Sequence, residues 1–186
     1  MNKFFATLLA AACAAGLSAG ELKIVKAAYG NGEQVNDVTE AFLKHAGGLP
    51  GTFLTITPSN KFFAPDPAPR KAKTLTVTYT DGGAEKSVRI PERQFGVVVA
   101  NADPAQEFKV LRAFYGSGRE WKEVTDKILP VIENNTILGI NNTTLGPDPA
   151  PRKKKELLVI YTQDNQVRFL QIPEKTDFSV DCFQKK

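Results

Sequence analysis

Two short basic runs are the parts of this sequence best suited to binding chemistry. The first contains Arg70, Lys71 and Lys73, and the second contains Arg152, Lys153, Lys154 and Lys155. Clustered cations bind anionic groups, such as the carboxylates or phosphates of an acidic glycan or a lipid head group. Lysines on an edge strand also prevent sheets from pairing with one another, so a solvated edge is the alternative interpretation.

Three aromatic residues are a second candidate surface. Phe62 and Phe63 are adjacent, and neighbouring residues of a strand cannot both point inward. Trp121 stands where the first half of the chain has Val35. Exposed aromatic rings can stack on sugars, which predicts a carbohydrate platform; packing within or between domains is the alternative.

The acidic residues form no recognisable catalytic pattern. Asp66 and Asp148 lie between prolines, where an Asx turn is the ordinary explanation and a calcium or sugar contact the alternative. Glu92 and Glu174 follow Ile-Pro at an expected strand end, which predicts solvated turn residues. We expect no catalytic residue, no cofactor and no metal site. A glycan-active hydrolase, or its accessory subunit, using a carboxylate pair is the alternative function.

These candidate residues recur because the chain contains a tandem repeat. Residues 65–92 reappear as 147–174 with 15 of 28 positions identical, and the more divergent 22–41 reappears as 108–127. A period of more than eighty residues is the length of a small domain and too long for a solenoid unit. Each copy should therefore bury its own core.

The boundaries follow from this repeat and from the composition of the first twenty residues. Residues 1–20 combine an early lysine, an uncharged apolar run and small residues before Glu21, which predicts a signal peptide. We then expect a first β domain at 21–99, a linker at 100–106 and a second β domain at 107–186.

The ends and the composition also limit the compartment and the partners. No apolar run reaches the ~20 residues of a membrane span, so we expect a secreted or periplasmic protein without a transmembrane segment. Cys13 only loosely resembles a lipoprotein cleavage site, so ordinary cleavage is favoured over a lipid anchor. The formal net charge of +4, with both signs mixed, does not indicate a nucleic-acid partner.

Alternation and turn residues predict a mainly β fold. The clearest strand is 74–80, with Leu75, Val77 and Tyr79 on its inward face. It should turn at Gly82-Gly83, and its equivalent at Asp164-Asn165, both typical of two-residue hairpins. Five or six such short strands per copy predict two tandem antiparallel β-sandwich or partly open barrel domains.

Three other features of the sequence predict local structure. In the first strand Val25, Ala27 and Tyr29 should share the inward face. A threonine should cap at most a short helix in each copy, and Pro130 should stop the second helix after about one turn. The PDPAPRK segment that begins each conserved block should be an extended, rigid connection.

One difference between the copies predicts their packing. Thr76 and Thr78 of the first copy correspond to Leu158 and Ile160 of the second. A sheet face that is polar in the first copy is therefore apolar in the second, and something should cover it. Because the linker is short, we expect the copies to pack against each other there.

A recurring order of motifs resembles a known family. Each copy has Tyr-Gly, then Val-Thr, then an apolar strand, then Asp-Pro, then a Lys-led strand ending in Tyr, then Ile-Pro. This order resembles the C-terminal domain of DnaJ-like protein subfamily C member 11, which also occurs in exported bacterial proteins. No J-domain accompanies it, because the sole histidine, His45, precedes Ala46-Gly47 and not Pro-Asp. The resemblance implies an accessory or binding module. We expect an exported, non-catalytic binding or scaffold protein of the cell envelope, whose partner is an anionic glycan or another envelope protein.

Overall fold

The fold is given by a computed structural model that describes residues 21–184. The expected signal peptide and Cys13 lie outside the described residues. The structure is mainly β, with antiparallel sheets and short helices, as the sequence predicted. Within residues 21–184 the strands form no closed barrel, and no helix is long and apolar enough to cross a membrane.

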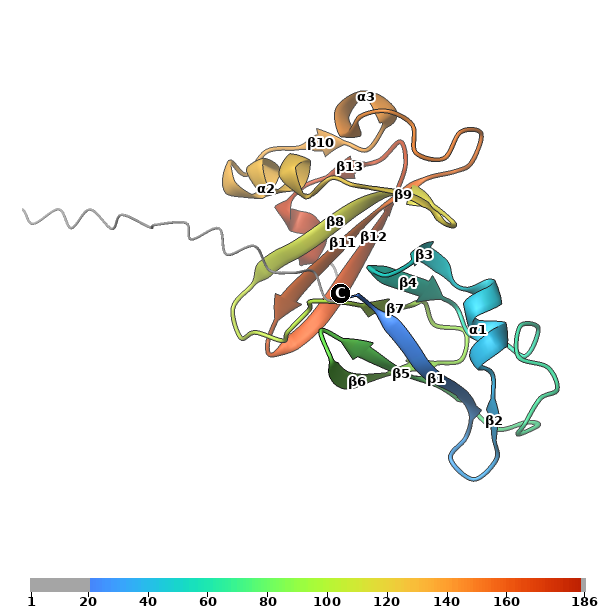
Figure 1. The fold of residues 1–186 in the computed structure, drawn as a ribbon. Helices are drawn as coiled ribbons and strands as arrows, with labels where there is room; N and C mark the ends of the chain where they lie inside the picture. Colours follow the sequence, from blue (N-terminus) through green and yellow to red (C-terminus); the bar gives the residue numbers. More distant parts are fainter. Residues whose placement is uncertain (1–20, 185–186) are drawn as a thin grey trace, which may run out of the picture.

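The first copy consists of two sheets and one helix (Figure 1). Its elements are β1 (Lys23–Gly30), β2 (Val35–Asp37), α1 (Thr39–His45), β3 (Gly47–Leu49), β4 (Phe53–Ile56), β5 (Thr74–Asp81), β6 (Ala84–Pro91) and β7 (Gly96–Val99). The larger sheet has the order β2-β1-β5-β6 and the smaller sheet has the order β3-β4-β7. All pairings are antiparallel.

The second copy repeats this plan with a reduced small sheet. Its elements are β8 (Lys109–Ser117), β9 (Glu120–Glu123), α2 (Thr125–Glu133), β10 (Leu138–Gly139), α3 (Asn142–Leu145), β11 (Glu156–Gln163), β12 (Gln166–Pro173), β13 (Asp177–Phe178) and a closing 3-10 helix (Val180–Phe183). The larger sheet has the order β12-β11-β8-β9, whereas only β10 and β13 remain of the smaller one.

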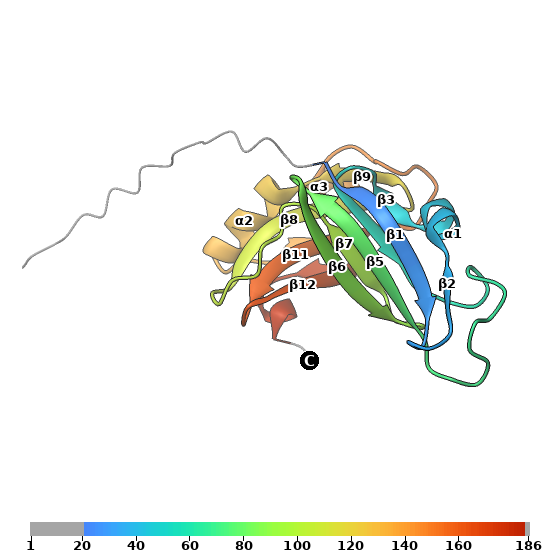
Figure 2. The ribbon, with the colours of Figure 1, turned by 60° about the horizontal axis from the view of Figure 1, so that its bottom comes forward.

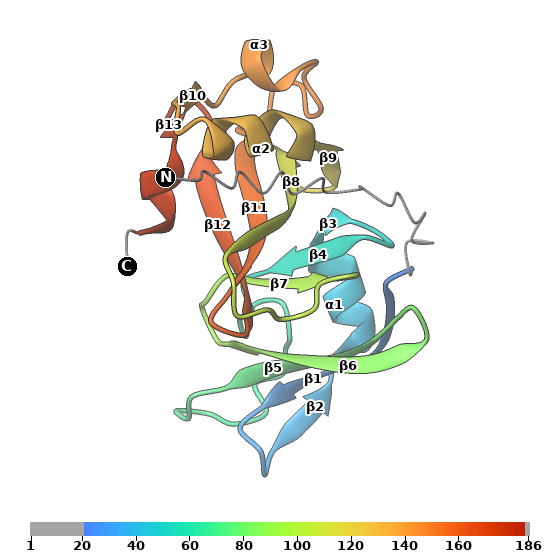
Figure 3. The same cartoon turned by 90° about the vertical axis from the view of Figure 1, so that its left-hand side faces the viewer.

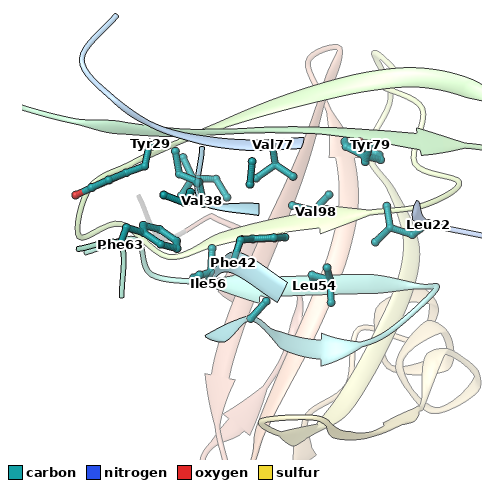
Figure 4. Close-up of a cluster of buried hydrophobic side chains, with 14 of the residues drawn as sticks. Leu22, Tyr29, Val38, Phe42, Leu54, Ile56, Phe63, Val77, Tyr79 and Val98 are labelled. Atoms are coloured by element: carbon teal, nitrogen blue, oxygen red, sulfur yellow. The ribbon is translucent and has the colours of Figure 1, made fainter. Parts of the chain in front are cut away.

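Each core lies on the inner face of its larger sheet. In the first copy Val77 and Tyr79 of β5 face Leu54 of β4 and Val98 of β7, with Phe42 of α1 between the layers (Figure 4). The predicted inward positions of β5 are confirmed, because its burial alternates residue by residue. The predicted hairpin turns are confirmed as well. Gly82 and Gly83 have φ of 59° and 89°, and Asp164 and Asn165 have 52° and 56°.

Two expectations about the opening strand and its threonine are wrong. Val25 is 51 % exposed, because a bulge between Ile24 and Lys26 reverses the alternation before Ala27. Thr39 does not cap α1: its hydroxyl accepts a hydrogen bond from the Ala27 N–H at 2.9 Å and so ties the helix start to β1.

Two expectations about prolines are also wrong. Pro130 lies inside α2, which continues to Glu133, and the Asn134 N–H closes the last turn on the Pro130 carbonyl at 3.0 Å. The PDPAPRK segment turns instead of extending. The Lys71 N–H donates to the Ala68 carbonyl at 3.2 Å, and Arg70 has a φ of 64°.

The two copies pack together, as predicted, with the small sheet of the first beside the large sheet of the second (Figure 3). An apolar layer of side chains from both copies lies between these sheets. The outer face of the small sheet in the first copy meets the outer face of the large sheet in the second. Phe53 lies 4.4 Å from Phe114 between ring centroids, and Leu158 and Ile160 are buried beside them. Arg119 adds a polar contact: its guanidinium donates to the Leu43 and Ala46 carbonyls at the end of α1.

The corresponding outer faces that do not meet have polar side chains at the positions equivalent to those that are most buried between the copies. On the large sheet of the first copy, Thr76 and Thr78 replace Leu158 and Ile160. In the second copy, the positions equivalent to the first copy's apolar residues Phe53, Val97 and Val99 hold Asn135, Ser179 and Asp181, which lie in the segments next to β10 and β13. Some apolar side chains remain exposed on these uncovered faces: Val25 and Val35 in the first copy are 51 % and 48 % exposed, and Ile137 in the second is 72 % exposed.

Candidate functional site

A buried lysine organises the PDPAPRK loop of the first copy. The Lys73 ammonium, whose side chain is 3 % exposed, lies 3.4 Å from an Asp66 oxygen and 3.3 Å from a Glu92 oxygen. It also donates to the Lys71 carbonyl at 3.0 Å. Tyr29 extends the network, because its hydroxyl bonds the Asn60 side chain at 3.0 Å, and that amide donates to Asp66 at 2.8 Å.

The same network occurs in the second copy. The Lys155 ammonium lies 3.3 Å from an Asp148 oxygen and 3.3 Å from a Glu174 oxygen. The Tyr115 hydroxyl bonds Asn142 at 3.0 Å and donates to Glu174 at 2.8 Å. Five residue types at five equivalent positions therefore tie together strand starts, strand ends and the loop in both copies.

Hydrogen bonds and neighbouring charges favour the charged forms of the two carboxylates and the lysine, and the neutral form of the tyrosine. Hydrogen bonds from Tyr115 and Lys155 hold the pKa of Glu174 below its ordinary value. Burial opposes ionisation of Asp148, but the Ala150 N–H and Lys155 lower its pKa on balance. Burial raises the pKa of the Tyr115 phenol, and the neighbouring Glu174 carboxylate raises it further. Burial works against the Lys155 cation, but Glu174 and Asp148 raise its pKa overall.

This geometry corrects the expected basic clusters. Lys73 and Lys155 are buried in the networks, so the expectation that they bind a ligand as exposed cations is wrong. Glu92 and Glu174 are not solvated turn residues, because their side chains are 15 % and 18 % exposed and bind those lysines. The Asx turns are confirmed for Asp66, which accepts from the Ala68 N–H at 3.0 Å, and likewise for Asp148.

The remaining cations border a pocket of about 580 Å³ in the first copy. Arg70 and Lys71 come from the PDPAPRK loop, and Arg93 comes from the turn after β6. Asp66, Lys73 and Glu92 also line it. We call the exposed residues Arg70, Lys71 and Arg93 the first rim.

A second rim occupies the equivalent positions of the second copy. It consists of Arg152, Lys153, Lys154 and Lys175. All of these residues are exposed, and the two PDPAPRK loops project from the same side of the molecule (Figures 1 and 2). Among the rim residues only Lys71 and Lys153 have a carboxylate partner within residues 21–184: Glu33 at 3.7 Å and Glu120 at 3.0 Å.

Four rim residues hold a left-handed backbone. The φ angles are 64° for Arg70, 64° for Arg93, 66° for Arg152 and 68° for Lys175. A left-handed conformation costs a residue with a Cβ roughly 1–2 kcal/mol, a cost that glycine avoids. A cation nevertheless stands at each of the four positions. The side chain, and not only the turn, is therefore what both copies retain.

The aromatic candidates are not a platform. Phe63 is 1 % exposed, and its ring centroid lies 5.1 Å from that of Tyr29 in the core. Phe62 stacks on His45 with centroids 4.7 Å apart. Trp121 packs edge-on against Phe53 in the layer between the copies, and its indole N–H donates to the Gly118 carbonyl at 2.9 Å.

Sequence reasoning missed two pairs of residues. Asn60 and Asn142 complete the networks, and Arg93 and Lys175 complete the rims. The available signal was their equivalence: each pair lies 82 residues apart, the spacing of the conserved block. Residues 21–184 contain no cluster of three or more His, Cys, Asp or Glu side chains arranged to hold a metal ion.

The chain matches no protein-family model, no curated protein and no solved structure.

Proposed function

We propose that this protein is an exported, non-catalytic binding protein of the cell envelope that holds an acidic glycan through its two rims. The observation that carries the proposal is the retention of cations at the four left-handed positions. These positions flank the same buried network in both copies, so the fold presents each rim on the same rigid support.

The charge of the first rim favours an anionic ligand. Four cations and two carboxylates line its pocket, which leaves a net positive charge. Arginine matches the planar geometry of a carboxylate or phosphate through paired hydrogen bonds. A pocket of about 580 Å³ has the size of a site for one or a few sugar units.

The carboxylates of the networks argue against the hydrolase alternative. A glycosidase needs one carboxyl group that stays protonated to donate to the leaving oxygen. In the second copy both carboxylates bind the Lys155 ammonium, and both have lowered pKa values. Neither is suited to be the general acid at neutral pH.

Binding of polygalacturonate, a uronic-acid polymer, tests the proposal, with neutral dextran as the control glycan. Arg70→Ala with Arg93→Ala should weaken binding about tenfold, as expected for two lost solvent-exposed ion pairs of up to ~1 kcal/mol each. Arg152→Ala with Lys175→Ala should do the same. Calorimetry of the chain from Glu21 onward is a suitable measurement.

A charge-matched control separates site binding from general attraction. Lys26→Ala with Lys109→Ala removes two exposed cations away from both rims. It should leave the affinity within about twofold, the range of a screened long-range effect. Equal losses for the rim and control variants, or equal binding of dextran, would refute the proposal.

A further inference from the structure

A groove lies between the two copies, away from the rims. It has a volume of about 450 Å³. One wall contains residues 86–88 of β6 and the other contains residues 167–169 of β12, while Val97, Val99 and Ile160 line the groove between them. The groove thus depends on both copies and on the packing between them.

Both walls are free strand edges. β6 is the last strand of its sheet and β12 is the last strand of the other, so each pairs on one side only. Successive side chains of a strand point to opposite faces. Three consecutive residues can therefore line one groove only where the groove runs along the strand's edge.

The register identifies which main-chain groups are unpaired. Gln163 and Gln166 flank the two-residue turn between β11 and β12 and form its closing pair. Hydrogen-bonded and non-hydrogen-bonded pairs then alternate along the ladder, so the N–H and C=O groups of Val167 and Phe169 point outward. An extended peptide is the ligand whose own backbone matches such a row.

The edges of β6 and β12 differ in how readily each could pair with an added strand. β6 carries Glu85, Lys86 and Arg89, charges of the kind that protect an edge from pairing. β12 exposes the large apolar side chain of Phe169. The Arg168 Nε is buried without a hydrogen-bond partner among residues 21–184, although another guanidinium nitrogen binds Asp164 at 3.1 Å.

We propose that the groove binds an extended segment of a partner protein, which pairs with β12 as an added strand. Alternate side chains of this segment are apolar and fill the groove between Val97, Val99 and Ile160. The segment needs no charge of its own, because the cations on the two walls already have carboxylate partners. The Lys86 ammonium lies 2.8 Å from Asp81 and 2.9 Å from Asp103, and the Arg168 guanidinium lies 3.1 Å from Asp164. This interaction is independent of glycan binding at the rims.

An array of octapeptides tests the proposal directly. One half of the array alternates apolar residues with serine, and the matched half has the same composition with the apolar residues adjacent to one another. We expect the alternating half to contain binders and the matched half to bind at least about tenfold more weakly, because alternation places all apolar side chains on one face of an extended strand. An array without binders, or with equal binding by both halves, would overturn the proposal.

Removing main-chain N–H groups, first from the protein and then from the peptide, tests strand pairing itself. Val167→Pro removes one outward N–H at an edge position that tolerates proline, whereas Val167→Ala keeps it. The proline variant should lose about tenfold in affinity for the best peptide, as for a lost main-chain hydrogen bond, and the alanine variant should not. Should Val167→Pro fail to fold, N-methylation of alternate peptide residues removes the same hydrogen bonds from the ligand. Undiminished binding of the methylated peptide in both registers would contradict pairing with β12.

Discussion

The two copies keep one face of the same strand and change the other. On the inner face of β5 and β11, Leu75, Val77 and Tyr79 correspond to Leu157, Val159 and Tyr161, and all six are buried. On the outer face, two threonines correspond to Leu158 and Ile160. The inner positions are fixed by a core that each copy must bury alone, whereas the outer positions are free to acquire an interface.

The lysine networks belong to the unchanged part. They repeat residue for residue, and they lie at the ends of the inner strands. The unchanged residues stabilise each copy by itself, whereas the changed residues join the two copies. Substitutions in the two sets should therefore have different effects.

The largest effect is expected where the copies differ. Leu158→Thr combined with Ile160→Thr gives the second copy the first copy's outer face. Burial of the two side chains contributes ~1.5–3 kcal/mol each, so their loss should separate the copies without unfolding either one. Small-angle scattering should show a more extended particle, and urea unfolding should split into two transitions.

Val25→Thr is the matched control for this pair of changes. It alters a β-branched apolar residue that is 51 % exposed in β1, outside the layer between the copies. It should leave the scattering curve and the single transition unchanged. A double variant as compact as the native chain would mean that the apolar layer does not hold the copies together.

A smaller effect is expected where the copies agree. Lys73→Met leaves Asp66 and Glu92 without their shared cation and should cost about 3 kcal/mol of unfolding free energy. Lys155→Met should act in the same direction on the second copy. Lys71→Met, which changes an exposed neighbour in the same loop, is the control and should be nearly neutral in urea denaturation.

The smallest effect concerns acid. The folded-state pKa of Glu174 lies below its unfolded value, so its contribution to stability is present above the unfolded pKa of ~4.3 and is lost as the pH falls through the folded value. Glu174→Gln should therefore flatten the pH dependence of the melting temperature below about pH 4.5, where this titration begins. An acid-melting curve of unchanged slope would contradict the assigned ionisation.

Local patterns were sufficient for most of the fold. Leu75, Val77 and Tyr79 alternate strictly, and the glycines after them fix a hairpin, so the sequence determines this part of the sheet. The bulge before Ala27 could not be predicted, because it depends on where β1 pairs with β5. The length of α2 also escaped prediction, since packing of Ile128 and Val131 on the core outweighs the proline's missing hydrogen bond.

The candidate site was predictable only in part. The basic runs contain the exposed Arg70 and Arg152, but nothing local distinguishes them from the buried Lys73 and Lys155. A lysine is buried only when carboxylates from distant segments surround it, and Glu174 joins Lys155 through a strand pairing that no short pattern encodes. Burial, and hence the difference between a ligand-binding cation and a structural one, is a property of the assembled fold.

The packing of two different faces against each other has a consequence for the assembly of further units. When the front of one unit fits the back of the next, the contact does not close on itself, and further units can add without limit into a filament. Here the exposed front carries Asn135, Ser179 and Asp181, and the exposed back carries threonines. A further unit added in the same way would therefore bury polar side chains at these positions, a cost that disfavours growth beyond the two copies.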